Sequence, residues 1–208
     1  MKLKAVTIDA YGTLVTLRDP VPALRAALAD REIDRSAEEV RRAFELEVAF
    51  YLAHSHEGCD SAALALLRRD CTRVFLEAAS VELDPGNFTS AFVSSLTFAE
   101  LPGARAACRA LSAAGLLLAV VSNWDVGLHE HLEGLGIGSF VDTVVTSAEA
   151  GAPKPAPAVF ELALARLGVD ARQAVHVGDA VLDEGGAHAA GLRFEWAPLA
   201  DAARRILG

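Results

Sequence analysis

The chain has 208 residues, too many for one small domain and too few for two full ones, so one core with an inserted subdomain is expected. Its formal charge of −9 disfavours nucleic-acid binding, and charges interrupt every apolar run, which excludes a membrane span. The start of the chain resembles no signal segment and the three cysteines are widely spaced, as in reduced proteins. We therefore expect a cytoplasmic protein that acts on a small molecule, with no nucleic-acid or membrane partner.

Five short apolar runs bounded by turn residues predict strands, at residues 3–8, 116–121, 143–145, 174–177 and 192–196. The last four alternate with stretches of helical periodicity, such as 104–114 and 157–167. Such alternation is typical of a parallel sheet covered by helices on both faces. The expected fold class is therefore α/β, with a Rossmann-like parallel sheet as its core.

Residues 20–98 differ from the rest of the chain, because their periodicity is almost wholly helical and contains no convincing strand. Asp19 before Pro20 suits the start of one helix, and Ser36 with Glu39 forms a capping box at the start of another. We expect a core domain of residues 1–15 and 97–208. A helical cap of residues 16–96 is expected to be inserted after the first strand.

Polar residues follow several of the predicted strands, where ligands bind in an open parallel sheet. The segment Asp9-Ala-Tyr-Gly-Thr-Leu follows the first strand, and Ser122-Asn123 follows the second. Gly178-Asp179 and Asp183 follow the fourth, and before it Lys154 lies between two prolines. A carboxylate that ends a buried strand is costly unless it is paired, so Asp9 is a strong candidate for function.

These segments, in this order, resemble the four motifs of the haloacid dehalogenase (HAD) superfamily: Asp9-x-x-Gly-Thr-Leu, Ser122-Asn123, Lys154-Pro-x-Pro and Gly178-Asp-x-x-x-Asp. The resemblance covers nearly the whole chain, although the cap matches only by its position and helical character. It implies a HAD-like fold and a hydrolase in which Asp9 attacks the substrate. A carboxylate nucleophile forms an ester that water then opens, which divides one difficult displacement into two.

The resemblance also implies roles for the other motif residues. Lys154 supplies positive charge, the Ser122 hydroxyl and the Asn123 amide hold equatorial oxygens of a phosphate, and the Thr13 hydroxyl orients Asp9 or its product. Mg²⁺ is expected between Asp9, the backbone carbonyl of Tyr11 and Asp179. Either Asp183 or Glu184 is the second acidic residue of the fourth motif.

Two features of the motifs favour different reactions. HAD phosphatases usually carry a second aspartate two positions after the nucleophile as general acid and base, whereas this chain has Tyr11, as true haloacid dehalogenases do. A phenol stays protonated at neutral pH, so it can donate a proton but cannot readily accept one. Asp179 favours the other reaction, because dehalogenases work without metal and replace the first acidic residue of this pair. Without a cation, Asp179 and Asp183 or Glu184 would raise the pKa of Asp9 by like-charge repulsion, which argues for bound Mg²⁺.

The leading expectation is therefore a Mg²⁺-dependent phosphatase for a small phosphorylated metabolite, over which the cap closes to exclude water. The alternatives are a metal-independent haloacid dehalogenase and a binding protein with the same fold and little turnover. Arg42 is the cap residue nearest in position to an arginine of dehalogenases, and it could bind either kind of anion. His54 and His56 are expected in an exposed cap loop, and His176 in the core. Substrate identity and oligomeric state are not readable from the sequence.

Overall fold

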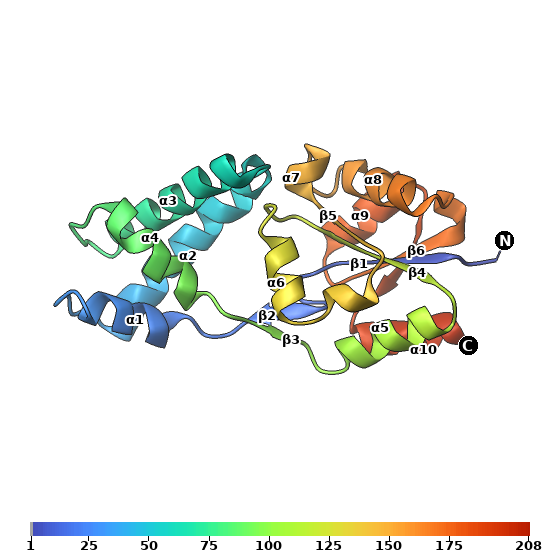
Figure 1. The fold of residues 1–208 in the computed structure, drawn as a ribbon, viewed down its shortest axis with the longest axis horizontal. Helices are drawn as coiled ribbons and strands as arrows, with labels where there is room; N and C mark the ends of the chain where they lie inside the picture. The colour runs from blue at the N-terminus through green and yellow to red at the C-terminus, as the bar shows by residue number, and fades with distance from the viewer. Residues whose placement is uncertain (1) are drawn as a thin grey trace. The chain divides into compact units, whose positions relative to one another are not determined.

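The computed structural model describes residues 2–208 and contains a five-stranded sheet whose strands are all parallel. The strands are β1 (Ala5–Ile8), β4 (Leu117–Ser122), β5 (Thr143–Thr146), β6 (Ala174–Gly178) and β7 (Arg193–Trp196). Their order across the sheet is β5-β4-β1-β6-β7, so β1 lies in the centre between β4 and β6 (Figure 1). The α/β class and the parallel core are confirmed, and each predicted strand lies within two residues of an observed one.

The continuous burial of the central strands explains why they read as apolar runs rather than as alternating ones. Every residue of β1 and β6 is buried, because helices cover both faces of the sheet. Figure 1 shows α8 and α9 on one face and α5 and α10 on the other. On the α8 face, Ala119, Val121 and Ala174 of the sheet pack with Val159 and Phe160 of α8.

The helices of this core follow the predicted alternation. Their bounds are α5 (Ala104–Ala113), α6 (Leu128–Gly134), α7 (Ser147–Ala150), α8 (Ala158–Leu167), α9 (Val181–Ala189) and α10 (Leu199–Leu207), with 3₁₀ turns η2 (Gly138–Phe140) and η3 (Ala171–Gln173). None of the helices in the described residues has the length and hydropathy that a membrane span requires.

The inserted segment contains four helices, α1 (Val21–Ala29), α2 (Ala37–His54), α3 (Ser61–Ala78) and α4 (Pro85–Ser95), and the 3₁₀ turn η1 (Ser55–Glu57). They pack around a core of their own that includes Phe75, Phe88 and Phe92. The predicted capping box at the start of α2 is confirmed, because Glu39 N–H donates to the Ser36 hydroxyl and Ser36 N–H donates to the Glu39 carboxylate.

Two short strands at the ends of the insertion were not predicted. β2 (Val15–Leu17) and β3 (Phe98–Glu100) form a separate two-stranded sheet, although the segment up to Phe98 was expected to lack strands. Three residues are too few to show a period of two, so the sequence carried no signal for them. Contacts divide the chain into two compact units: residues up to Thr16 together with Ala99–Gly208, and Leu17–Phe98.

Candidate active site

The carboxyl ends of the three central strands bring the predicted motifs together in the core unit. Asp9 directly follows β1, Ser122 is the last residue of β4, and Asp179 directly follows β6. β1 pairs with both neighbours, so the three residues meet at one edge of the sheet. The loop before α8 adds Lys154 to this group, as its contacts with Asp9 show.

Lys154 occupies the centre of the cluster. Its ammonium nitrogen lies 2.5 Å from Oδ1 of Asp9 and 2.5 Å from Oδ1 of Asp183, and it donates a third bond to the carbonyl of Val121 at 3.2 Å. Only 2% of the lysine side chain is exposed. A buried lysine with three acceptors is not a solvated surface charge, and the prediction that Lys154 lies beside Asp9 is supported by this geometry.

The charges of this cluster shift one another's pKa values. Burial lowers the pKa of Lys154, but Asp9 and Asp183 more than offset it, so the net shift is upward and the amine stays charged. Burial raises the pKa of Asp9 above its ordinary value, against the opposing effect of Lys154. Burial also acts to raise the pKa of Asp183, but the nearby His176 and Lys154 together hold it below the usual range.

Ser122 and Asn123 act on different parts of the site. The Ser122 hydroxyl donates to Oδ1 of Asp9 at 3.1 Å, so it holds the proposed nucleophile. The side-chain amide of Asn123 bonds the backbone of Lys154 twice, accepting from its N–H at 2.6 Å and donating to its carbonyl at 3.1 Å. Asn123 thus fixes the lysine loop. One amide hydrogen is left for a ligand, and direct contact with substrate stays a prediction.

Asp183 rather than Glu184 belongs to the cluster. Asp183 is 1% exposed, with one oxygen on Lys154 and the other accepting from the N–H of Ala180, whereas Glu184 is half-buried and outside the group. The close approach depends on Gly178 at the end of β6, because a Cβ on that residue would lie 2.6 Å from Cβ of Asp183. This packing decides the ambiguity that the sequence left open.

The donor set fits a hard divalent cation. Oxygens of Asp9, Asp179 and Asp183 lie within 4.8 Å of one another, and carboxylate oxygens are ligands that Mg²⁺ prefers. Three carboxylates beside one ammonium leave two negative charges uncompensated in a mostly buried site, and burial together with Asp183 raises the pKa of Asp179. A divalent cation would neutralise this excess. That the Tyr11 carbonyl is a further ligand stays a prediction. The side chain of Tyr11 is 51% exposed.

Two buried polar atoms beside these residues have no hydrogen-bond partner within the described chain: Oγ1 of Thr13 and Nε2 of His176. Thr13 is 2% exposed, so its hydroxyl is available to a bound group, in keeping with the predicted role. His176 is fully buried, as expected of a core residue, but its Nε2 also lies 3.6 Å from Oδ1 of Asp183. Nδ1 lies 2.9 Å from the Thr7 hydroxyl and 3.1 Å from the Thr7 carbonyl oxygen, which can only accept a hydrogen bond.

Sequence reasoning missed this proximity of His176 to the site. Thr7 and His176 are register partners on the adjacent strands β1 and β6, and a known register would have indicated their contact. Among the cap residues considered, Arg42 is exposed on α2, one turn from Glu39. The histidines were expected in an exposed loop, but His54 ends α2 and stacks on Phe50.

Comparison with known proteins places the chain in a hydrolase family. Residues 3–191 match the haloacid dehalogenase-like hydrolase family. The chain is 32% identical over 205 residues to the haloacid dehalogenase-like hydrolase domain-containing protein 3 of Bos taurus, covering 92% of this chain and 80% of that protein. The match to the Mus musculus protein of the same name is 43% identical over 102 residues but spans only 41% of its length.

The relatives with named activities include both a phosphatase and a dehalogenase. A phosphoglycolate phosphatase of Rhodospirillum rubrum is 34% identical, over 91% of this chain and 77% of that protein. A haloacetate dehalogenase H-2 of Moraxella sp. is 26% identical, over 94% and 85%. Among solved structures, the magnesium-bound HAD-hydrolase YfnB of Bacillus subtilis has the same fold, with a TM-score of 0.70 at 18% identity over 94% of this chain and 89% of that one.

Proposed function

The chain belongs to the haloacid dehalogenase-like hydrolase family, and we propose that it is a Mg²⁺-dependent phosphatase for a small phosphorylated metabolite. The observation that carries the proposal is the group of three carboxylate oxygens within 4.8 Å of one another, two of whose residues, Asp9 and Asp183, share one ammonium. A metal-independent reaction on Asp9 would be hindered by the two neighbouring carboxylates, whereas a divalent cation removes that repulsion. When bound, the cation would be held by Asp9, Asp179 and Asp183, and would supply positive charge to the phosphate oxygens.

In the proposed first step, a carboxylate oxygen of Asp9 attacks phosphorus, and the bond from phosphorus to the alcohol oxygen breaks. Lys154 and Ser122 both bond Oδ1 of Asp9, which leaves Oδ2 as the attacking atom. Because the lysine is held by Asn123 on its backbone and by Asp183 on its side chain, its charge is already in place and need not be reorganised during reaction.

The proposed reaction needs a proton donor, and we propose Tyr11 for this role. The departing alcohol oxygen needs a proton, and the exposed phenol two positions after Asp9 is the proposed donor. In the second step, water attacks the aspartyl phosphate, its proton returns to the phenolate, and phosphate leaves with Asp9 restored. Thr13, whose buried hydroxyl has no partner in the described chain, is proposed to orient Asp9 in both steps. The helical insertion is proposed to act as the cap that excludes water.

The test is an assay of a panel of phosphate esters with Mg²⁺ and with a chelator, on wild type, Asp9→Asn and Asp179→Asn. We expect turnover that depends on Mg²⁺, none with Asp9→Asn, and a raised Mg²⁺ requirement with Asp179→Asn. Absence of turnover on every ester, together with halide release from 2-chloropropionate, would overturn the proposal.

Dehalogenation is the second candidate, favoured by Tyr11 in place of the usual aspartate and by the similarity to the haloacetate dehalogenase. A halide leaving group needs no protonation, so the missing acid would be no loss. Chelator-insensitive chloride release from 2-chloropropionate would support it, and complete absence of release would reject it.

A binding protein with little turnover is the third candidate, motivated by the same missing aspartate. If only that group is lacking, Tyr11→Asp should create or sharply raise phosphatase activity. Failure of Tyr11→Asp to raise activity would count against this reading, as would efficient turnover by the wild type.

A further inference from the structure

A cavity of about 640 Å³ lies beside the edge strand β7 of the core sheet. Its walls include Leu3, which precedes β1, and Arg193 to Glu195 of β7, so it begins at the amino ends of the strands and runs along the edge strand β7. None of the residues that line it belongs to the cluster of Asp9, Lys154, Asp179 and Asp183. The cavity therefore has no part in the reaction at Asp9, and its volume is in the range of small-molecule sites.

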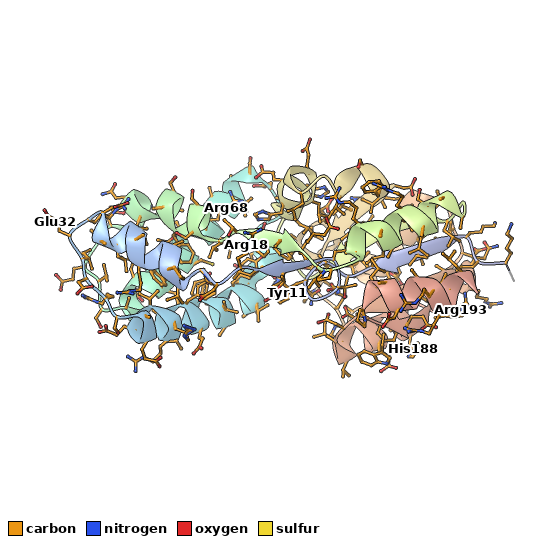
Figure 2. All side chains as sticks on the ribbon, turned by 90° about the horizontal axis from the view of Figure 1, so that it is seen from below. Tyr11, Arg18, Glu32, Arg68, His188 and Arg193 are labelled. Atoms are coloured by element: carbon orange, nitrogen blue, oxygen red, sulfur yellow. The ribbon has the colours of Figure 1, made fainter. Side chains whose placement is uncertain are left out.

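The walls combine apolar side chains with one arginine whose side chain has no partner in the described chain. Val175 of β6, Ile206 of α10 and Leu3 provide apolar surface. Within the described residues, the side chains of Arg193 and His188 take part in no hydrogen bond or ion pair, and Figure 2 shows both labelled side chains at the same end of the molecule. Both therefore have N–H donors available to a ligand.

The other charged walls of the cavity neutralise each other. Arg205 donates to the Glu195 carboxylate at 2.7 Å and to the carbonyl of Trp196 at 2.8 Å. Glu195, the only acidic residue among those that line the cavity, is thus paired with Arg205. The guanidinium of Arg193 therefore gives the cavity a net positive charge, although the formal charge of the chain is −9. A planar guanidinium suits a carboxylate or another oxyanion, which it can hold by two parallel bonds.

We propose that this cavity binds an amphipathic organic anion, with its charged group on Arg193 and its apolar body against Leu3, Val175 and Ile206. His188 supplies a further donor at the rim. A ligand here cannot touch the nucleophile, so it stabilises the core by binding the folded state alone. The inference does not depend on which reaction Asp9 performs.

The experiment uses three naphthalene probes with the same body and different charged groups: 2-naphthoate, naphthalene-2-sulfonate and 2-naphthylmethylammonium. Each is titrated into the intact protein by calorimetry, and the site is located from backbone amide shifts of β7 by NMR. We expect both anions to bind at one site and to shift the β7 amides, and the cation to bind at least about tenfold more weakly.

Three variants complete the test. Arg193→Gln removes this guanidinium and should weaken anion binding about tenfold or more. Arg41→Gln, at an exposed arginine of α2 that has no ion pair within residues 2–208, should leave it unchanged. Ile206→Trp fills the cavity with every charge retained and should abolish binding. Equal binding by wild type, Arg193→Gln and Ile206→Trp would overturn the proposal, as would no binding of either anion to wild type. It would also be overturned if the β7 amides responded to protein concentration rather than to the probes, because a second copy would then occupy this face.

Discussion

Gly12 and Asp179 come so close that the first cannot carry a side chain. A Cβ built on Gly12 would lie 2.1 Å from Oδ2 of Asp179. Gly12 also has a φ of +80°, a backbone conformation that residues other than glycine rarely adopt. The glycine of the first motif thus makes room for the aspartate of the fourth, although 167 positions separate them in the sequence.

Gly12→Ala is therefore expected to displace Asp179 and to weaken Mg²⁺ binding and turnover by about tenfold or more. Gly115→Ala is the matched control, because Gly115 also has a φ of +80° but nothing lies within 4 Å of its Cβ position. Both variants should lose about 1–2 kcal/mol of unfolding free energy through backbone strain. Urea unfolding and a Mg²⁺ titration of activity measure the two effects, and equal activity of the two variants would contradict the assignment.

Lys154→Met is expected to abolish turnover and to lower the free energy of unfolding by about 3–5 kcal/mol in the absence of metal. Removing the ammonium leaves Asp9 and Asp183 buried without their shared partner, which is more damaging than the loss of one hydrogen bond. Lys4→Met, at an exposed lysine, is the control and should change stability by no more than about 0.5 kcal/mol. A wild-type unfolding midpoint for Lys154→Met would show that the ion pairs are not formed in solution.

Asn123→Ala is expected to lower kcat about tenfold or more while changing KM less, because the side chain positions the Lys154 loop through two hydrogen bonds. Loss of its two bonds should also destabilise the protein by about 1–3 kcal/mol. Asn87→Ala, at the exposed asparagine of α4, is the control in the steady-state and unfolding assays. A raised KM with unchanged kcat would instead assign Asn123 to substrate binding.

Glu47 gives a pH dependence that does not involve the active site. It is buried in the helical insertion, where desolvation raises its pKa to about 7 against the smaller opposing effect of a bond from Cys71. A carboxyl with a raised pKa favours folding while it is protonated, so this contribution is present below the ordinary value of 4.5 and is lost as pH rises through 7.

Glu47→Gln is therefore expected to raise the unfolding free energy of the protein by about 3 kcal/mol near pH 8, and by about 1 kcal/mol or less near pH 5. The amide keeps the shape of the side chain but cannot ionise. Urea unfolding at the two pH values measures the difference, with Glu45→Gln, an exposed change two positions earlier on α2, as the control. A gain that is the same at both pH values would contradict the raised pKa.

The sequence predicted most of the fold because local patterns carry it. The buried strands β1, β4 and β6 appear as continuous apolar runs, and the capping box of Ser36 and Glu39 is a contact between residues three positions apart. The predicted and observed strand ends differ by one residue at most, except at the start of β1, where the apolar run begins two residues earlier. The three-residue strands β2 and β3 were missed because so short a segment has no period.

By itself, the sequence determined the α/β class, the helical insertion and the four strand-end segments that carry Asp9, Ser122, Lys154 and Asp179. Only the tertiary structure decided that one ammonium joins Asp9 to Asp183, that Asp183 and not Glu184 faces the site, and that Gly12 makes room for Asp179. The physical reason is the sequence separation between the residues that interact. Periodicity and capping depend on neighbours within a few residues, whereas a hydrogen bond between residues more than 100 positions apart depends on strand register and side-chain packing, which no local pattern contains.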